Sequence, residues 1–259
     1  MAGADRSRAI HVRDLEVGFA RATVLDGVSL DCRRGEILGL VGASGSGKSV
    51  LLRAILGLVP RRRGHIEVLG RDVDEGGSDN AGRRWGVLFQ QGALFSALTV
   101  RQNVEFPMRE HLKLSERLMR EVAMAKLELV GLKPEDAVKL PAELSGGMIK
   151  RAALARALAL DPEIVFLDEP TSGLDPVAAG AFDNLIRTLQ DTLRLTVFLV
   201  THDLNSVTRI CDRVAALAQG RVVAIGSLED VLASNDPFVR SFFGAQAARS
   251  LRVDSERSS

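Results

Sequence analysis

Tyrosine is absent from this sequence, and cysteine and tryptophan are scarce, with two and one in 259 residues. Cys32 and Cys211 lie far apart and lack the spacing of metal ligands, which favours buried thiols in a reducing compartment over a disulfide framework. No apolar run is long enough to cross a bilayer, and residues 1–8 lack the apolar core of a secretory signal. We therefore expect any work at a membrane to depend on a partner protein.

A marked excess of charge is also missing. The 34 lysines and arginines nearly balance the 33 aspartates and glutamates, so a net charge of +1 gives no electrostatic reason to expect nucleic acid as a partner. The run Arg61–Arg63 is local and typical of a solvated turn. Hydrophobic residues make up 46% of the chain and charged residues 26%, which indicates a globular protein of one large domain, with or without an insertion.

The most informative stretch present is rich in glycine and follows the apolar run Ile37–Val41. Glycine permits backbone conformations closed to other residues, so successive N–H groups can point at phosphate oxygens. The helix predicted next adds the partial positive charge of its N-terminus. The pattern predicts nucleotide-phosphate binding by Gly42, Ala43, Ser44, Gly45, Ser46, Gly47, Lys48, Ser49 and Val50.

Two side chains of this stretch have specific expected roles. Lys48 is placed to reach the β- and γ-phosphates, and the Ser49 hydroxyl is placed to bind the Mg²⁺ that bridges them. The alternative is a chance glycine-rich turn with a surface lysine. A complete pattern between a buried-type strand and a helix disfavours that alternative.

The rest of the chain alternates strands and helices. Interleaved apolar and polar residues predict antiparallel strands before the glycine-rich stretch. Apolar runs at 85–89, 164–167 and 196–200 predict further strands, and 213–225 is typical of a closing hairpin that turns at Gln219–Gly220. Strands separated by helices favour an α/β fold with a mainly parallel sheet, which binds ligands at the C-terminal ends of its strands.

Helical patterns dominate the middle of the sequence. Thr99 caps a helix predicted over 100–108, and Ser115 begins a second amphipathic helix that ends at Gly131. We interpret residues 92–160 as a helical subdomain inserted into an α/β domain of residues 8–244.

Further boundaries follow from breakers and composition. A helix is predicted from Ser145 through Asp161, where Pro162 prevents its continuation, and another from Pro176 to about Asp191. Residues 72–84 are rich in Gly, Asp and Asn and predict an exposed loop. We expect the tail 245–259, which has few apolar anchors, to be mobile or bound to a partner.

Polar side chains follow several of the predicted strands. Asp168 ends a buried strand, where it can hold Mg²⁺ through water, and Glu169 is placed to act as general base toward the attacking water. Gln90 ends another strand and can touch the Mg²⁺ or the water, and His202 ends a third and can bond the γ-phosphate. Taken singly, each residue is equally explained by hydrogen bonds to local backbone groups.

The stretch Leu144–Gly147 and the polar residues at the strand ends are together far more specific than any of them singly. With these features, the chain resembles the ATP-binding subunits of ABC transporters over nearly its whole length. The resemblance covers the family's motifs in their usual order. They are a Walker A loop at 42–49, a Q-loop at Gln90, a signature at 144–148, Walker B at 164–169, a D-loop at 172–175 and a switch histidine at His202.

This resemblance implies ATP and Mg²⁺ as ligands and two copies packed head to tail. Each ATP then lies between the Walker A loop of one copy and Ser145, Gly146 and Gly147 of the other, and Asp175 joins the site from the D-loop. A helix N-terminus without bulky side chains suits a γ-phosphate held across an interface, and a two-fold arrangement places two ATP molecules there.

Two positions depart from the family pattern. Met148 replaces the usual glutamine of the signature and leaves the phosphate-facing Ser-Gly-Gly intact. The usual adenine-stacking tyrosine is absent, and Phe19 stands at that position. From the sequence alone, Phe19 fits equally well as a core residue and as a ring that stacks on adenine. Because it stands where the family has its tyrosine, the resemblance favours stacking, without the hydroxyl.

Within the family, the stretches 89–95 and 103–111 and the Met148 signature are similar to the ATPases of lipid-moving transporters that work with MCE-domain proteins, most of all the Mla phospholipid system of Gram-negative bacteria. That resemblance implies transmembrane permease subunits, an MCE-domain lipid-binding protein, a STAS-domain protein and a location on the cytoplasmic face of the inner membrane. The apolar Leu94, Phe95 and Leu98 are candidates for the groove that receives the permease.

Other functions remain open at this point. One alternative is the ATPase of a small-solute importer. Another is a soluble ABC ATPase of DNA repair or translation, but the sequence has no long coiled-coil insertion, second nucleotide domain or basic surface of the kind typical of those proteins.

Overall fold

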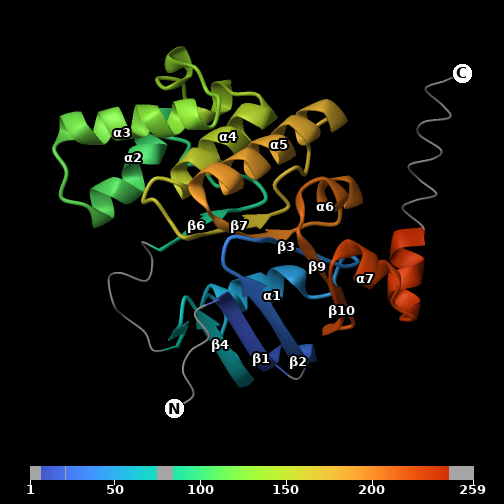
Figure 1. Ribbon diagram of the computed structural model, residues 1–259. Coiled ribbons are helices and arrows are strands. Elements are labelled where there is room, and N and C mark those ends of the chain that lie inside the picture. The colour runs from blue at the N-terminus through green and yellow to red at the C-terminus, as the bar shows by residue number, and fades with distance from the viewer. Residues whose placement is uncertain (1–6, 21, 75–83, 245–259) are drawn as a thin grey trace, which may run out of the picture. The chain divides into compact units, whose positions relative to one another are not determined.

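The computed structural model describes residues 7–20, 22–74 and 84–244 (Figure 1). The chain divides into two compact units. The first contains residues 1–75 and 200–259, and the second contains residues 76–199. The expected boundaries, an 8–244 domain with a helical insertion at 92–160, stay a prediction, because the division into units follows packing rather than the motifs.

The first unit contains an antiparallel sheet, as the alternating pattern predicts. Its strands follow the order β2-β1-β4-β5 and comprise β1 (Arg8–Phe19), β2 (Ala22–Arg33), β4 (Arg63–Val68) and β5 (Arg71–Asp72). Val12 faces Leu30 on one neighbouring strand and Ile66 on the other, and all three side chains are buried. Alternating apolar residues therefore bury one face of this sheet.

A second set of strands in this unit carries the glycine-rich loop. β3 (Ile37–Val41) is buried along its whole length and pairs in parallel with β9 (Arg213–Ala218), which pairs antiparallel with β10 (Arg221–Gly226). α1 (Lys48–Ile55) packs against β1, β2 and β4. The predicted hairpin turn at Gln219–Gly220 is confirmed, and a Cβ at Gly220 would lie 2.3 Å from Val24 O, so only glycine fits.

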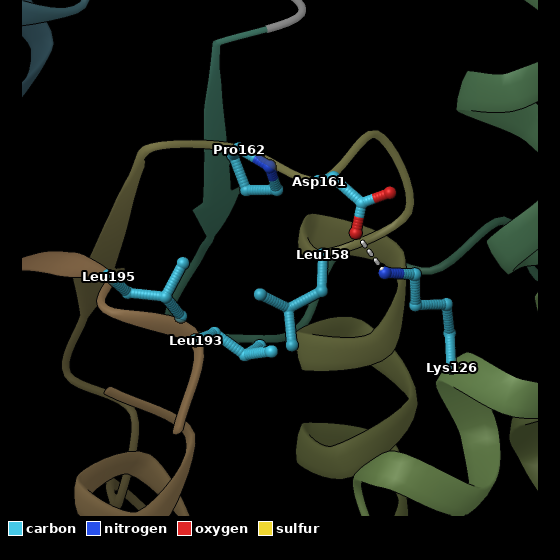
Figure 2. Close-up of a pocket in the computed structure, with 6 residues that line it drawn as sticks. All are labelled: Lys126, Leu158, Asp161, Pro162, Leu193 and Leu195. Carbon is cyan, nitrogen blue, oxygen red and sulfur yellow. Dashed lines mark hydrogen bonds and ion pairs between the residues drawn. The ribbon is translucent and has the colours of Figure 1, made fainter. Parts of the chain in front are cut away.

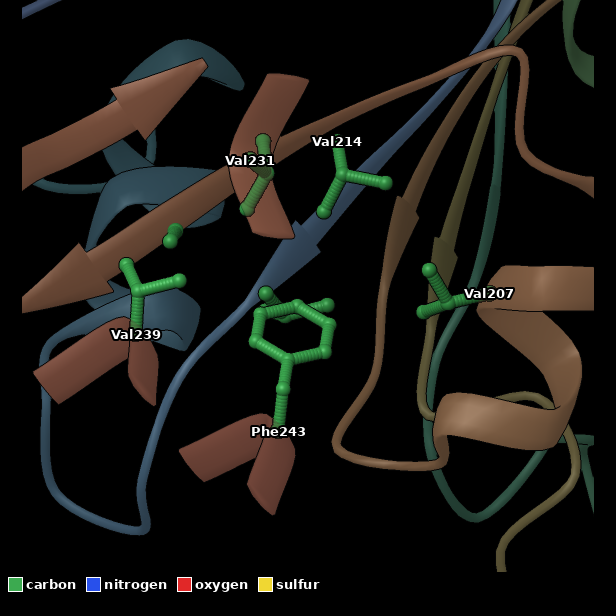
Figure 3. Close-up of a cluster of buried hydrophobic side chains, with 7 residues drawn as sticks. Val207, Val214, Val231, Val239 and Phe243 are labelled. Carbon is green, nitrogen blue, oxygen red and sulfur yellow. The ribbon is translucent and has the colours of Figure 1, made fainter. Parts of the chain in front are cut away.

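The C-terminal part of the first unit packs on this layer through apolar side chains. α6 (Leu204–Ile210), α7 (Leu228–Leu232) and a helical segment at 237–244 surround β9. The buried cluster between them consists of Val41, Val207, Val214, Ala216, Val231, Val239 and Phe243 (Figure 3). Residues up to 244 therefore belong to the folded unit. The predicted tail 245–259 lies outside the described residues.

The second unit combines three strands with helices. Its strands follow the order β8-β7-β6, and β6 and β7 run in parallel, with Leu88 opposite Leu167. The elements are β6 (Trp85–Leu88), α2 (Val100–His111), α3 (Glu116–Leu129), η2 (Pro134–Asp136), η3 (Pro141–Glu143), α4 (Gly146–Ala157), β7 (Ile164–Asp168), α5 (Pro176–Leu193) and β8 (Thr196–Val200). Phe166 lies between Trp85 and Phe198, at ring-centroid distances of 6.4 and 6.0 Å.

The predicted helix starts are confirmed by their caps. Thr99 and Ser115 accept hydrogen bonds from Gln102 N and Leu118 N, and α2, α3 and α4 pack against one another. Most of the predicted loop at 72–84 lies outside the described residues. The two-residue strand β5 ends at Asp72, where the predicted loop begins. Within the described residues, no helix is long and apolar enough to cross a membrane.

Two expectations were wrong in detail. α4 ends at Ala157 rather than Asp161, because the chain leaves the helix in a turn in which Asp161 has a φ of 50°, before Pro162 is reached. Cys32 is buried as predicted, but Cys211 is only half-buried.

The turn after α4 borders a small cavity of about 120 Å³ (Figure 2). Leu158, Pro162, Leu193 and Leu195 line it, and the ion pair between Lys126 and Asp161 lies at its side. This ion pair joins α3 to the connection between α4 and β7.

Candidate nucleotide-binding and hydrolysis residues

The glycine-rich loop adopts a backbone shape that only glycine fits at its key positions. Gly45 and Gly47 have φ values of 78° and 103°, in the left-handed region. A Cβ at Gly42 would lie 2.4 Å from Leu217 O, and one at Gly47 would lie 2.8 Å from Leu25 Cδ2. The loop leads directly into α1, whose first turn has no side-chain cap, so its N–H groups are available to an anion.

Lys48 lies across this loop. Its side chain is buried, and Nζ donates to Gly42 O at 2.8 Å and to Ala43 O at 3.0 Å. Ser46 Oγ is buried and has no hydrogen-bond partner among the described residues. The Lys48 ammonium and the Ser46 hydroxyl can both donate hydrogen bonds to phosphate oxygens bound in this loop. These residues therefore fit a bound nucleotide.

A cavity of about 550 Å³ opens beside the loop in the same unit. Residues 43–46 line one side of it, and Ala218, Gln219, Arg221, Val223 and the segment Asp236–Phe238 line the rest. The outer face of the loop is therefore accessible.

Phe19 is the last residue of β1 and is 52% exposed, so the structure does not place it in the core. The guanidinium of Arg62 secures the turn that follows. It donates to Ala20 O at 2.6 Å and to Thr23 Oγ1 at 3.3 Å, and it pairs with Glu16 at 3.7 Å. A Cβ at Gly18 would lie 2.5 Å from Arg62 Cζ, so glycine makes room for this contact.

His202 lies in the same unit as the glycine-rich loop. Thr201 N donates to Leu40 O at 3.1 Å, which places the residue before His202 beside the end of β3, where the loop begins. Asp203 accepts from Asn205 N at 2.9 Å and caps α6, so the exposed His202 is held between two anchored neighbours.

The acidic pair and Gln90 lie in the second unit at neighbouring strand ends. Asp168 is the buried last residue of β7, and Glu169 follows with a φ of 47°. Gln90 follows the parallel neighbour β6, and its Nε2 lies 3.5 Å from Ser172 Oγ. These residues therefore follow the C-terminal ends of two neighbouring parallel strands.

The signature begins α4 in this unit. Ser145 Oγ accepts from Met148 N at 3.3 Å, which leaves the following residues in a helix N-terminus at the surface. A Cβ at Gly147 would meet nothing within 4 Å, and one at Gly146 would meet only Leu174 Cδ2, at 3.7 Å. Packing among the described residues therefore does not require glycine at either position, which fits a contact made by another molecule.

Asp175 has a definite structural role. Its Oδ1 accepts from Val177 N at 3.0 Å and from Ala178 N at 2.9 Å and caps α5. The family resemblance places it at the nucleotide site, and the hydrogen bonds observed for it lie within its own helix.

Sequence reasoning missed the basic residues that hold these segments. Lys150 donates to the backbone carbonyls of Gln90 and Glu169, and Arg156 donates to Gly92 O at 2.8 Å and to Ala93 O at 2.6 Å. In the sequence, both look like solvated cations of an amphipathic helix. Lys150 is buried and Arg156 half-buried, and their partners include backbone carbonyls 60 and 64 residues away, so no short stretch of sequence signals these contacts.

Comparisons with known proteins agree with this site. Residues 25–172 match the family described as ABC transporter. The chain is 40% identical over 252 residues to the probable ribonucleotide transport ATP-binding protein mkl of Mycobacterium leprae, covering 96% of this chain and 72% of that protein. It is 39% identical over 241 residues to the intermembrane phospholipid transport system ATP-binding protein MlaF of Haemophilus influenzae, covering 92% and 91%. MlaF of Escherichia coli K12 is 40% identical over 237 residues, covering 90% and 87%.

Solved structures show the same fold. The ATP-binding cassette MJ0796, a dimer bound to ADP and Pi, aligns with a TM-score of 0.77 and 29% identity over 85% of this chain and 98% of that one. The cbiO1 protein of Clostridium perfringens aligns with a TM-score of 0.80 and 30% identity, over 88% and 92%. With its α/β fold and nucleotide loop, the chain belongs to the ABC transporter family and is one of its ATP-hydrolysing subunits.

Proposed function

We propose that this chain powers a transporter that moves phospholipids between the inner and outer membranes and so maintains outer-membrane lipid asymmetry. The observation that supports the proposal most is the 39–40% identity to two MlaF proteins, which extends over about nine tenths of both chains. Similarity over that length includes the helical segments of the second unit as well as the nucleotide motifs.

The proposed chemistry assigns a role to each group. The loop 42–47 and the start of α1, with Lys48 and Val50, bind the phosphates of ATP, and Phe19 stacks on the adenine. Ser49, Gln90 and Asp168 hold Mg²⁺, which supplies charge neutralisation on the phosphates when bound. Glu169 takes the proton from the attacking water, and His202 bonds the γ-phosphate.

The proposed assembly follows the family. A second copy contributes Ser145, Gly146, Gly147 and Asp175 to each ATP. The membrane-spanning part is formed by permease subunits, and a STAS-domain protein and an MCE-domain lipid-binding protein complete the complex on the cytoplasmic face of the inner membrane. Nucleic acid has no role in it.

An aromatic patch in the second unit is the candidate seat for the permease. Phe95 and Phe106 are 45% and 37% exposed, with ring centroids 4.6 Å apart. The Asn103 side chain is fully buried. Its Oδ1 accepts from Phe95 N, and its Nδ2 donates to Phe95 O and to Leu98 O, both at 3.1 Å. Two large exposed rings on an internally braced turn suit docking of an apolar segment.

A small-solute transporter is the second candidate, and the similarity to mkl favours it. That protein is named for ribonucleotide transport and is as similar in identity as the MlaF proteins. It is longer, so this chain covers 72% of it against 91% of Haemophilus MlaF. The matching length is why phospholipid transport is preferred.

Affinity purification of this chain from its native membrane tests the choice. Mass spectrometry of co-purifying proteins and lipids should find a permease, an MCE-domain protein, a STAS-domain protein and phospholipid. A solute permease with a solute-binding protein would overturn the phospholipid proposal and leave the ATPase assignment intact.

A further inference from the structure

Lys150 is a buried lysine one turn into the signature helix α4. Its ammonium donates to the backbone carbonyl of Gln90, and to that of Glu169 at 3.3 Å. One side chain therefore joins the segments that follow two neighbouring strands, β6 and β7. The segment after β6 carries Gln90, the proposed magnesium ligand, and the segment after β7 carries Glu169, the proposed general base.

A lysine in this position costs free energy. Only 5% of Lys150 is exposed, and desolvation by burial lowers the pKa of its ammonium, while the charges of Glu169 and Asp168 act in the opposite direction. Methionine or leucine would fill the same volume without that cost. The hydrogen bonds of the ammonium must therefore offset the free energy that its desolvation costs.

Both contacts engage the backbone of turns, and one of these turns contains an unfavourable backbone conformation. Glu169 has a φ of 47°, which is unfavourable for a residue with a side chain. The turn after it is closed by Ser172 N donating to Glu169 O at 3.1 Å, the same oxygen that Lys150 engages. The turn after β6 is closed by Gly92 N donating to Phe89 O at 2.7 Å.

The same helix holds the glutamine turn at a second place. Arg156 donates to Gly92 O and Ala93 O, so α4 engages this turn at both of its ends. The carbonyls that Arg156 engages lie in the glutamine turn, whereas Lys150 contacts both turns. The helix that carries the phosphate-facing Ser-Gly-Gly at its start thereby also carries the anchor of the general base.

We propose that Lys150 is a positioning residue for ATP hydrolysis, whose ammonium fixes the backbone of Gln90 and Glu169 to the signature helix. The inference rests on the proposed role of Glu169. It assigns to Lys150 a larger effect on the rate of the chemical step than on nucleotide binding, since Lys150 contacts none of the residues of the glycine-rich loop among its observed hydrogen bonds.

The test compares Lys150→Met, which keeps the length but removes the donors, with Lys150→Arg, which keeps donors. The control is Lys126→Met, a lysine of α3 that is also mostly buried and pairs with Asp161. For each full-length variant, kcat and KM for ATP are measured on the chain with its co-purifying membrane subunits. Amide hydrogen exchange at Gly92 and Ser172 is measured without nucleotide.

Lys150→Met should lower kcat about 10–100-fold with KM within about threefold, because misplacing a catalytic group by roughly 1 Å costs on that order. Exchange at Gly92 and Ser172 should accelerate about tenfold, since both amides close turns that Lys150 secures. Lys150→Arg should recover most of kcat, and Lys126→Met should change neither quantity.

Wild-type kcat and unchanged exchange in Lys150→Met would overturn the proposal. If that variant does not fold, Lys150→Gln, which is too short to reach both carbonyls, must show the same loss of kcat; a wild-type rate there would equally overturn it. Absence of ATP hydrolysis by the wild-type complex would instead overturn the proposed function, and the exchange result would then still decide whether Lys150 anchors the two turns.

Discussion

At the scale of single residues, the proposed mechanism depends most on Glu169. Replacing it by glutamine removes the proton acceptor and keeps the side-chain volume, so hydrolysis should fall by about 10²–10⁴-fold while ATP binding persists. Steady-state hydrolysis and equilibrium ATP binding measure the two effects separately.

Glu163→Gln is the matched control for that change, because Glu163 precedes the same strand and pairs with Arg84 at the surface. It should leave hydrolysis unchanged. Near-normal hydrolysis in Glu169→Gln would show that another group is the base.

Arg62 should affect binding of the adenine through Phe19. Arg62→Ala releases the turn after Phe19, and we expect ATP affinity to fall about five- to tenfold, the order of one aromatic stacking contact. Binding of tripolyphosphate, which lacks a base, should not change. Isothermal titration with both ligands measures the difference.

Two variants make this prediction specific. Arg63→Ala removes a neighbouring exposed arginine and should have no effect. In a Phe19→Ala background, Arg62→Ala should weaken ATP binding no further. An equal loss of tripolyphosphate affinity would mean that Arg62 acts on the phosphate loop or on the fold instead.

At the scale of elements, sequence periodicity and capping residues predicted most of the architecture. The antiparallel N-terminal strands, the buried strands β7 and β8, and the caps Thr99 and Ser115 follow from side-chain chemistry within a few residues of each element. The end of α4 could not be predicted in the same way. No helix-breaking residue follows Ala157 directly, and the turn that replaces the last predicted part of the helix includes Asp161 in a left-handed conformation.

The candidate site divides along the same line. Glycines, the lysine of the loop and the polar residues at strand ends have signals in a short window of sequence. Lys150 and Arg62 have none, because their partners are backbone carbonyls 60 and 42 residues away in the sequence. A cation in a helix or a turn indicates a solvated face until the structure shows which carbonyls it contacts.

The aromatic patch on α2 and the turn before it yields a prediction of its own. Phe106→Glu places a charge in the patch and should abolish co-purification of the permease and lipid transport, because an apolar docking segment cannot solvate a carboxylate. Nucleotide binding should be unchanged. Pull-down from membranes and ATP titration are the two measurements.

Leu118→Glu on α3 is the control for the patch, since Leu118 is also exposed, at 44%, but belongs to another helix. It should retain the permease. Retention of the permease by Phe106→Glu would remove the patch from the proposed interface.

At the scale of the whole molecule, the chemistry is divided among separate parts of the chain. The glycine-rich loop, Phe19 and His202 belong to the first unit, whereas Gln90, Asp168, Glu169 and the signature belong to the second. At the start of α4, Ser145 caps the helix, and packing among the described residues requires glycine at neither Gly146 nor Gly147. A dimeric cassette is among the structures similar to this chain, and the start of α4 is the surface at which we propose that a second copy binds.

The central claim is that hydrolysis by this chain drives phospholipid movement. The most direct measurement is ATP-dependent transfer of a labelled phospholipid by the purified complex in proteoliposomes, with wild-type chain and with Glu169→Gln. Transfer should require ATP and should stop in the variant although the complex stays assembled. ATP hydrolysis by a complex that moves a small solute and no phospholipid would contradict it.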